Sequence, residues 1–315
     1  MTTVSDMVYM LGGVPVAGGL GDVALAGGKW YFCDPTHGSA NADGTSPDTA
    51  NSSLLTVYNK CRDGYNDGVV FMGGATAWNP AAALTWSKNY THLIGTNNMP
   101  GLGNRCRIVA QAATALTVPV TFSGSGCLIK NIQIYNEKAA GAAAGTAIVT
   151  GSRNIFEDVF FMSPVATDAS SYSCKLGSAE NTFVRCTFGQ MTNPRTAASY
   201  NLWVHGAENV SRNKFIKCEF LSWSSSADHA HVLLDADMAA VPIVTWFEDC
   251  LFDNLGTSLT ESINDNCTSA GHQVVLRGHN DFLNVTAVGG TLTYIFAPNA
   301  AADVSGLLMI AVAES

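Results

Sequence analysis

The chain carries little charge, and most of what it carries is acidic. Asp, Glu, Lys and Arg make up only 13% of the 315 residues, and 16 Lys plus Arg against 25 Asp plus Glu give a net charge of -9. No basic stripe is available to meet phosphates, so we expect no nucleic-acid partner. The low charge and the 30 glycines, together with abundant Ala, Thr, Ser and Asn, predict turn-rich β structure over helical bundles.

A long apolar run and a basic N-terminus are also missing. The apolar stretch near the C-terminus, residues 307–313, is far shorter than the ~20 residues that a membrane-spanning helix needs. Residues 1–28 contain no Lys or Arg, and Asp6 stands where the basic region of a signal peptide would be. We therefore expect no membrane contact, no secretory leader and synthesis in the host cytoplasm.

The cysteines show no pairing motif. Their number, nine, is odd, and they form no CxxC pair and no dense framework. Reduced, buried thiols are the expected state in a protein made in the cytoplasm.

The chain does contain an internal repeat of about 30 residues. Clear copies of an eight-residue unit occupy residues 154–161, 181–188, 213–220 and 245–252, and weaker copies occupy 127–134 and 280–287. The first apolar position of the unit is filled by Ile129, Phe156, Phe183, Phe215, Phe247 and Phe282. A repeat of this length is the sequence signature of a fold in which each copy forms one structural unit stacked on the next.

The spacing inside the unit predicts a corner. An apolar residue is followed by another three positions later and by a third two positions after that, whereas residues three apart face opposite sides of a flat strand. Short strands joined by corners at this period are typical of a parallel β-solenoid. Stacked coils would align equivalent residues in inward ladders, for which we name Phe156, Cys186, Phe188, Cys218, Phe220, Cys250 and Phe252.

Two further rows are expected at the corners. One consists of residues that tolerate left-handed turns and can hydrogen-bond along the stack: Asn154, Asn181, Asn213 and Asn280. The other faces outward: Asn131, Asp158, Arg185, Lys217, Asp249 and Asn284. In this outward row the register predicts two ion pairs, Asp158 with Arg185 and Lys217 with Asp249.

The repeat resembles the right-handed parallel β-helix of the pectate-lyase-like superfamily. Ahead of it, the strand-like segment 30–34 and the Asp-Gly-Thr-Ser-Pro turn at 43–47 are similar to the opening of many phage and surface β-helix proteins, in which a short helix then caps the first coil. Residues 52–61 suit that helix, with an apolar face of Leu54, Leu55, Val57 and Tyr58. The resemblance implies an all-β right-handed solenoid at 29–290 with an N-terminal capping helix, preceded by an extended arm at 1–28 and followed by a cap or oligomer contact at 291–315.

Many β-helix proteins act on polysaccharides, so the acidic residues are candidates for chemistry. The strongest cluster lies in an expected excursion between coils and consists of Asp228, His229, His231, Asp235 and Asp237. Its two histidines alternate onto one strand face, as a pair of metal ligands would. Polar residues are common in such excursions, however, and we predict no metal here.

Other candidates for chemistry have simpler explanations. The acidic pairs at 157–158 and 248–249 belong to the outward charge row. Trp203, Trp223 and Trp246 could stack on sugars, but they could equally fill the core or cover a subunit face. The calcium-binding acids and catalytic arginine that pectate lyases use are not found on neighbouring coils. We therefore predict no catalytic residue and no cofactor.

The segment before the repeat suggests how the protein is used. Residues 7–28 are apolar and Gly-rich, and the side chains available to fill pockets on a partner are Tyr9, Met10, Leu11, Val14, Pro15, Val16 and Leu20. The chain resembles phage structural β-helix proteins, which implies a homotrimeric decoration protein, not an enzyme, docked by this arm on the major capsid protein at the virion surface. There are two alternatives. One is a tailspike-like polysaccharide depolymerase, that is, a glycoside hydrolase or lyase with a glycan partner, and the other is a surface adhesin.

Overall fold

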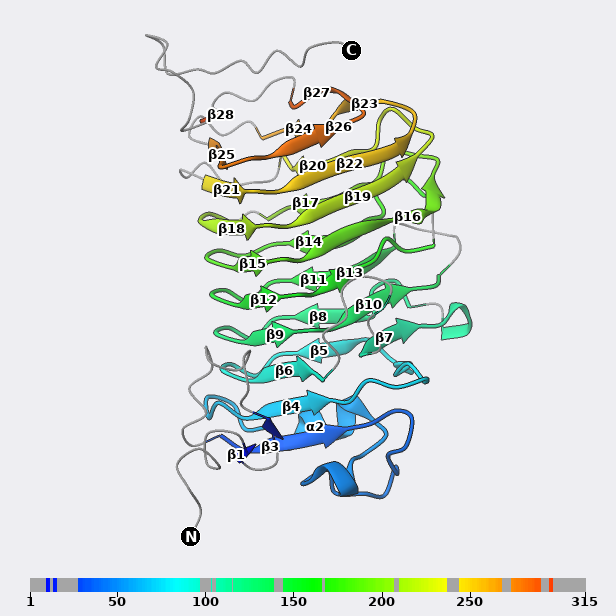
Figure 1. Cartoon of the computed structure of the whole chain (residues 1–315), viewed down its shortest axis with the longest axis vertical. Helices are drawn as coiled ribbons and strands as arrows, with labels where there is room; N and C mark the ends of the chain where they lie inside the picture. Colours follow the sequence, from blue (N-terminus) through cyan, green and yellow to red (C-terminus); the bar gives the residue numbers. More distant parts are fainter. Residues whose placement is uncertain are drawn as a thin grey trace.

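The chain winds in stacked coils around one long axis, as the computed structural model shows (Figure 1). The structure describes residues 28–96, 103, 106–114, 116–138, 144–165, 168–206, 210–236, 244–267 and 273–289, and the backbone alone at 10–11, 14–15 and 295–296. This arrangement confirms the predicted right-handed parallel β-helix.

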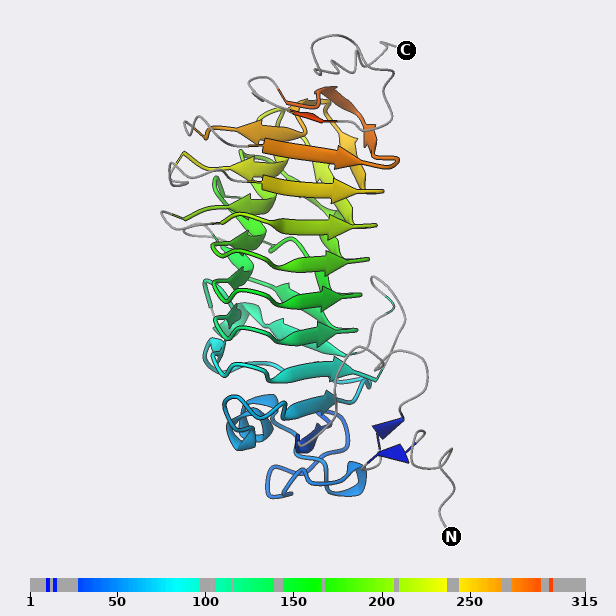
Figure 2. The ribbon, with the colours of Figure 1, turned by 90° about the vertical axis from the view of Figure 1, so that its left-hand side faces the viewer.

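Three parallel sheets form the faces of the solenoid (Figure 2). The first sheet contains β3 (Trp30–Cys33), β4 (Gly68–Phe71), β6 (His92–Gly95), β9 (Leu128–Lys130), β12 (Ile155–Glu157), β15 (Thr182–Val184), β18 (Asn213–Ile216), β21 (Val244–Glu248), β25 (Gln273–Arg277) and β28 (Ile295–Phe296). The second contains β7 (Arg107–Ala110), β10 (Gln133–Asn136), β13 (Phe160–Phe161), β16 (Thr187–Arg195), β19 (Glu219–Ser224), β22 (Leu251–Gly256) and β26 (Asp281–Leu283). The third contains β5 (Leu84–Trp86), β8 (Val120–Phe122), β11 (Gly145–Val149), β14 (Tyr172–Leu176), β17 (Tyr200–Val204), β20 (Ala230–Leu234) and β24 (Ile263–Asp265).

A few elements lie outside these sheets. Strand β23 (Leu259–Glu261) pairs in parallel with β27 (Val285–Ala287), and β1 (Met10–Leu11) pairs antiparallel with β2 (Val14–Pro15). The helical elements are η1 (Pro47–Thr49), α2 (Leu54–Lys60) and η3 (Ala112–Thr114). No helix in the described part of the chain is long and apolar enough to cross a membrane.

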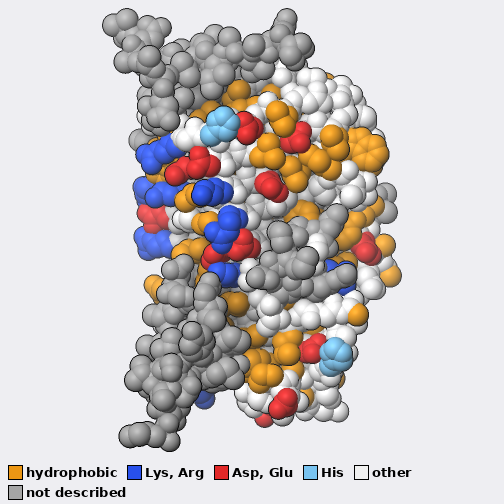
Figure 3. Space-filling view, viewed as in Figure 1, with side chains coloured by type: hydrophobic (Ala, Val, Ile, Leu, Met, Phe, Trp, Pro, Cys, Tyr) orange, Lys and Arg blue, Asp and Glu red, His pale blue; other side chains and the backbone are white. Residues whose placement is uncertain are grey.

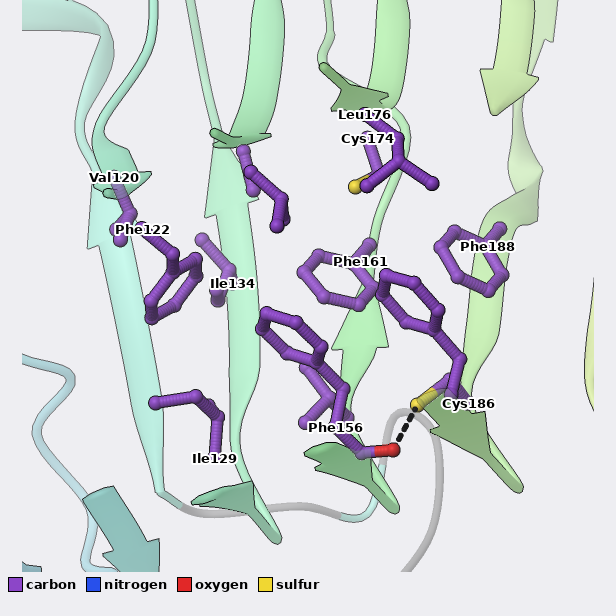
Figure 4. Packing of buried hydrophobic residues seen from close by; sticks show 14 of the residues in the cluster. Val120, Phe122, Ile129, Ile134, Phe156, Phe161, Cys174, Leu176, Cys186 and Phe188 are labelled. Atoms are coloured by element: carbon purple, nitrogen blue, oxygen red, sulfur yellow. Dashed lines mark hydrogen bonds between the residues drawn. The ribbon is translucent and has the colours of Figure 1, made fainter. Parts of the chain in front are cut away.

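Two ladders of phenylalanine rings fill the interior (Figure 4). The first sheet stacks Phe156, Phe183, Phe215 and Phe247, with neighbouring ring centroids 4.7 to 5.0 Å apart. The second sheet stacks Phe161, Phe188, Phe220, Phe252 and Phe282 at 4.6 to 5.2 Å. This spacing is close to the distance between hydrogen-bonded strands, so each ring is held by the sheet register itself.

Three thiols lie between the two ring ladders, at the short corner that joins the first sheet to the second. Cys186, Cys218 and Cys250 are buried and unbridged. The Sγ of Cys186 donates to the backbone carbonyl of Phe156 at 3.3 Å, a contact drawn in Figure 4. Cys218 and Cys250 make the same bond to Phe183 and Phe215 on the next two coils. The row therefore packs as small, weakly polar core residues.

The corner itself has a left-handed residue in each coil. Asn131, Asp158, Arg185, Lys217 and Asp249 have φ between 51° and 55°. In the following coil the position belongs to Gly278, with φ 66°, and not to Asn284 as the alignment predicted. The weak last copy was misaligned because its Asp-Phe pair belongs to the second sheet: Phe282 is in register with Phe252, while Leu276 is in register with Phe247.

The asparagine row bonds along the stack, but it does not supply the left-handed turns. The Oδ1 atoms of Asn154, Asn181 and Asn213 accept the backbone N–H of Cys127, Asn154 and Asn181, respectively, at 2.8 to 2.9 Å. The positive φ belongs to the preceding residue of each coil, Arg153, Glu180 or Arg212. Thr245 takes the next place in the row, and Asn280 instead caps the backbone N–H of Cys250.

The N-terminal cap follows the prediction in outline. Ser53 caps α2, which buries Leu54, Val57 and Tyr58, whereas Leu55 is exposed. The residues named for the arm fall outside the described residues, apart from the backbone of β1 and β2. The boundaries at 28 and 291 stay predictions.

Candidate functional site

The outer face of the third sheet carries the main polar and aromatic cluster in the described part of the chain. In the last three residues of β14, β17 and β20 the first and third side chains point into the core, and the middle side chain points outward. The register places Lys175 beside Trp203, and Trp203 beside Leu233. His205 follows Val204, the last core residue of β17, and Asp235 follows Leu234, the last core residue of β20. Both side chains lie on the same outer face as Trp203.

Two tyrosines flank this row on the same face. Tyr172 and Tyr200 are register partners, and their rings lie 5.6 and 5.9 Å from the Trp203 ring. Tyr172 lies over Gly145, where a Cβ would come within 2.1 Å of the phenol ring. A glycine is therefore required beneath this tyrosine.

Asp235 connects the cluster. Its Oδ2 accepts the Nε1–H of Trp203 at 2.8 Å and lies 2.8 Å from the Nδ1 of His205. The Nζ of Lys175 lies 3.9 Å from the centroid of the Trp203 ring, which is a cation–π contact. We call Tyr172, Lys175, Tyr200, Trp203, His205 and Asp235 the third-sheet cluster.

The surroundings fix the charge states of these groups. Partial burial works to raise the pKa of the Asp235 carboxyl, but the hydrogen bonds from His205 and Trp203 outweigh burial and lower it. Burial raises the pKa of Tyr172 to about 12, and burial followed by the charges of Asp235 and Asp228 raises the pKa of Tyr200. At neutral pH the cluster thus offers an ionised carboxylate, an ammonium group, two phenolic hydroxyls and an indole ring on one face.

The predicted acidic cluster is divided by the sheet. Residues 230–234 form β20 and not an excursion; His229 and His231 are buried in the interior. Asp235 faces outward with His205, Asp228 is exposed, and residue 237 lies outside the described residues. Among the described residues no group of three or more His, Cys, Asp and Glu side chains is placed to hold a metal ion.

The outward corner row forms part of the expected charge ladder (Figure 3). Arg185 bonds both oxygens of Asp158 at 2.8 Å and also pairs with Glu157, which binds Lys130 on its other side at 2.9 Å. The second predicted pair does not form, because Asp249 accepts the backbone N–H of His279 and the described residues provide no ion pair for Lys217. The bonds made by Glu157 and Asp158 are those of a structural ladder.

The remaining tryptophans lie on other faces. Trp223 is an exposed residue of the second sheet, in register with Leu255. Trp246 faces outward on the first sheet, and the centroid of its ring lies 5.5 Å from the Nζ of Lys214.

Sequence reasoning missed most of the third-sheet cluster. A signal existed, because the apolar runs before the repeat units align as Cys174-Lys-Leu, Leu202-Trp-Val and Val232-Leu-Leu. The middle position of each run is the outward one.

The fold and this cluster define a right-handed parallel β-helix with a polar, aromatic patch on one outer face. The sequence matches no protein-family profile and no curated protein. Among solved structures, it is similar to the pectin methylesterase PemA from Erwinia chrysanthemi, with 13% identity, a TM-score of 0.53, and coverage of 87% of this chain and 90% of that one. It is also similar to the pectate lyase Pel9A, with 12% identity, a TM-score of 0.56, and coverage of 88% and 82%. A pectin methylesterase from Aspergillus niger matches at 14% identity and a TM-score of 0.54, over 90% and 94%.

These comparisons correct one expectation. The prediction that the protein is not an enzyme is wrong, because solved structures that share its fold over most of its length are polysaccharide-modifying enzymes. At these identities the likeness shows the fold alone. The chemistry must be argued from the residues of this chain.

Proposed function

We propose that this protein is a polysaccharide-acting enzyme whose substrate lies across the outer face of the third sheet. The observation that carries the proposal is the third-sheet cluster, in which one carboxylate oxygen of Asp235 contacts both Trp203 and His205 beside the ammonium group of Lys175. Enzymes acting on pectin provide the fold-level support. Of the functions predicted from the sequence, this corresponds to the depolymerase alternative.

The groups divide into binding and proton-transfer roles. The rings of Trp203 and Tyr200 provide apolar area with a hydroxyl donor at its edge, which suits a sugar ring, and the buried Tyr172 ring supports Trp203 from the side. The Asp235–His205 pair can hold a proton and pass it on, since an ionised carboxylate orients the imidazole and stabilises its protonated form. Lys175 supplies positive charge beside the same ring, where negative charge on a substrate or transition state would be stabilised.

The experiment is an activity screen of the full chain on pectin, pectate and bacterial surface polysaccharides. Reducing ends report hydrolysis, an unsaturated sugar product reports elimination, and released methanol reports ester cleavage. On the best substrate we expect Asp235→Asn to lower kcat/KM at least ~100-fold, because general acid–base catalysis contributes factors of that size. Trp203→Ala should act mainly through weaker binding, seen as a higher KM.

Trp246→Ala is the matched control. Trp246 also faces outward next to a lysine, but it belongs to the first sheet and its indole N–H makes no hydrogen bond among the described residues. Equal loss of activity in Trp203→Ala and Trp246→Ala, with both variants folded, would argue against the third sheet as the site. Absence of all three products on every polysaccharide would reject the enzymatic assignment.

Partners and location remain proposals of their own. A capsid protein bound by the N-terminal arm, a homotrimer and a place on the virion surface are compatible with a depolymerase. Sedimentation of full-length and arm-deleted protein with undecorated capsids tests the arm, and native mass measurement at micromolar concentration tests the trimer.

A further inference from the structure

A second apolar surface lies on the outer face of the first sheet, near the N-terminal end of the solenoid. Outward side chains of β3, β4, β6 and β9 form a cluster separate from the core: Phe32, Val70, Ile94 and Leu128. Val70, Ile94 and Leu128 are only 5%, 7% and 4% exposed, although their neighbours in the strands are the ones that point into the core. In β12, the next strand, Ile155 is in register with Leu128 and is 41% exposed. A cover therefore lies over these four strands and ends before β12.

The described residues supply little of this cover. Besides the strand residues, the cluster contains Ala50 from the loop before α2 and the partly buried Trp30 and Met72, which belong to or directly follow the same strands. The Trp30 ring lies across Gly68, where a Cβ would come within 2.5 Å of it, and stacks on His92 with ring centroids 6.4 Å apart. The apolar side chains must therefore be buried by a segment outside the described residues. We call Trp30, Phe32, Val70, His92, Ile94 and Leu128 the first-sheet strip.

Two hydrogen-bond donors in the strip lack acceptors. The Nδ1 of His92 accepts the backbone N–H of Leu128 at 3.1 Å. Burial lowers the pKa of His92 to about 4, so the ring is neutral at pH 7, and because Nδ1 accepts, its proton sits on Nε2. This Nε2–H and the Nε1–H of Trp30 are both buried without a partner in the described part of the chain. The cover must then offer acceptors, as the carbonyls of a polypeptide backbone do.

The N-terminal arm begins beside the strip. The backbone N–H of Lys29 donates to Oδ1 of Asp67 at 2.7 Å, and Gly28 lies so close to the carbonyl of Asn66 that a Cβ would come within 1.9 Å of that oxygen. The chain ahead of β3 is thus held against the coil of β4, on the side from which the stack continues to β6 and β9. The 12 residues at 16–27, between β2 and Gly28, can reach about 40 Å when extended. The distance from β3 to β9 is only about 15 Å at the usual strand spacing.

The composition of this segment fits the strip. Its large apolar side chains are Val16, Leu20, Val23 and Leu25. The rest of residues 16–27 is Gly and Ala apart from Asp22, and glycine lets a backbone approach closely enough to bring its carbonyls to buried donors. The other nearby candidate, residues 97–105 between β6 and β7, contains three asparagines and an arginine beside Met99 and Leu102. The N-terminal arm is therefore the better match for an apolar face.

We propose that residues 16–27 fold back over the first-sheet strip as an intramolecular cover. Their side chains pack on the outward residues of β4, β6 and β9, and their backbone carbonyls accept from the indole of Trp30 and the imidazole of His92. Ordering a Gly-rich backbone offsets most of the gain from burial, so the cover adds little net stability and can be displaced. A partner that captures the arm would thus expose the strip. The strip belongs to the first sheet, so this inference is independent of the third-sheet cluster.

Two matched cysteine substitutions in the full chain measure the cover. Ile94→Cys places a thiol in the strip, and Ile155→Cys places one at an exposed outward position of the same sheet. Peptide mass spectrometry follows alkylation by an uncharged reagent at each site, separately from the partly exposed native Cys267. We expect Ile94→Cys to react at least ~10-fold more slowly than Ile155→Cys in the full chain, and at a similar rate once residues 1–27 are removed. Equal rates in the full chain, or protection that survives the deletion, would overturn the proposal.

Two sets of charge substitutions at full length identify the covering segment. The first set is Val16→Asp, Leu20→Asp, Val23→Asp and Leu25→Asp together. It should abolish the protection of Ile94→Cys, because four carboxylates cannot be buried on an apolar strip. The second set, Met99→Asp with Leu102→Asp, should leave the protection intact. If the arm-deleted chain does not fold, these sets still decide, since protection that persists in the first set or is lost only in the second rejects the arm as the cover.

Discussion

At the scale of single residues, the interior of this solenoid contains groups that water normally solvates. Thiols fill one ladder, and neutral histidines bond to serines or to the backbone. His92 accepts the backbone N–H of Leu128 on Nδ1 at 3.1 Å, and His231 lies 2.9 Å from the Ser262 hydroxyl. Each such group is tolerated in one protonation state only, so its environment can be tested by changing charge.

The thiol ladder should be inert until the protein unfolds. Burial is the main cause that raises the pKa of Cys218 well above its ordinary value, so thiolate is scarce and reagent has no access. We expect Cys186, Cys218 and Cys250 to resist alkylation in native protein and to react in denaturant, as measured by mass spectrometry. Cys218→Asp should lower the free energy of unfolding by about 3–5 kcal/mol and Cys218→Ala by about 1 kcal/mol. A native disulfide between any two of these residues would contradict the observed register.

Because of the buried histidines, the protein should become less stable as the pH is lowered. Burial lowers the pKa of His92 and His231 to about 4, whereas the unfolded chain titrates near 6.5. Above pH 6.5 neither state binds the proton. Below it only the unfolded state does, so stability is lost from about pH 6.5 down to about pH 4. The slope is about 1.4 kcal/mol per pH unit for each histidine.

Urea denaturation at several pH values measures that slope. His92→Asn keeps an acceptor for Leu128 but removes the titrating ring, so it should reduce the loss between pH 6.5 and pH 5 by about 2 kcal/mol. His37→Asn is the control, since the His37 side chain is 81% exposed. An unchanged slope in His92→Asn would mean that His92 is protonated in the folded protein.

At the scale of the element, the short corner between the first and second sheets determines which residues face inward. A left-handed residue turns the chain, the next residue enters the thiol ladder, and the side chain of the turning residue points to solvent. Asn and Asp, which tolerate a left-handed backbone, occupy this position in three coils, Arg and Lys occupy it although that backbone disfavours them, and Gly278 occupies it once.

Glycine should therefore be favourable at such a corner. Lys217 has φ 53° and no ion pair among the described residues, so Lys217→Gly should raise the free energy of unfolding by about 0.5–1 kcal/mol. The comparison is Glu219→Gly, an exposed strand position in β19, which should lower it by a similar amount. Equal losses in the two variants would show that Lys217 contributes contacts that outweigh its backbone strain.

The same corner explains what the sequence could predict and what it could not. Phe156 and Cys186 recur with their neighbours at fixed offsets, so the ladders and the fold could be inferred from periodicity. The last copy could not, because Phe282 repeats the local pattern from a different sheet. The third-sheet cluster was also hidden, since Lys175, His205 and Asp235 come from three coils and meet only through register. Side chains brought together by stacking leave no local motif, and only the alignment of the apolar runs before the repeat units points to them.

At the scale of the whole molecule, a solenoid needs protected ends, because an exposed last coil presents unpaired strand edges. The N-terminal end is covered by α2, whose Tyr58 ring stacks on Trp86 with centroids 4.1 Å apart. The Tyr58 hydroxyl also accepts the backbone N–H groups of Ser87 and Lys88, at 2.6 and 2.9 Å. The helix is thus joined to the stack by both apolar packing and hydrogen bonds.

This attachment predicts different outcomes for two deletions. Removing residues 1–27 leaves β3, α2 and all described contacts of the cap in place, so the melting temperature should change by less than about 2 °C. Removing residues 1–66 deletes β3 and α2, exposes Trp86 and leaves an edge of the first sheet unpaired, so the product should aggregate or melt at least about 10 °C lower. Size-exclusion chromatography and circular dichroism distinguish these outcomes. A stable, monodisperse product of the longer deletion would mean that the coils from β4 onward protect their own end. A large fall in melting temperature after the shorter deletion would mean that the N-terminal arm is part of the cap.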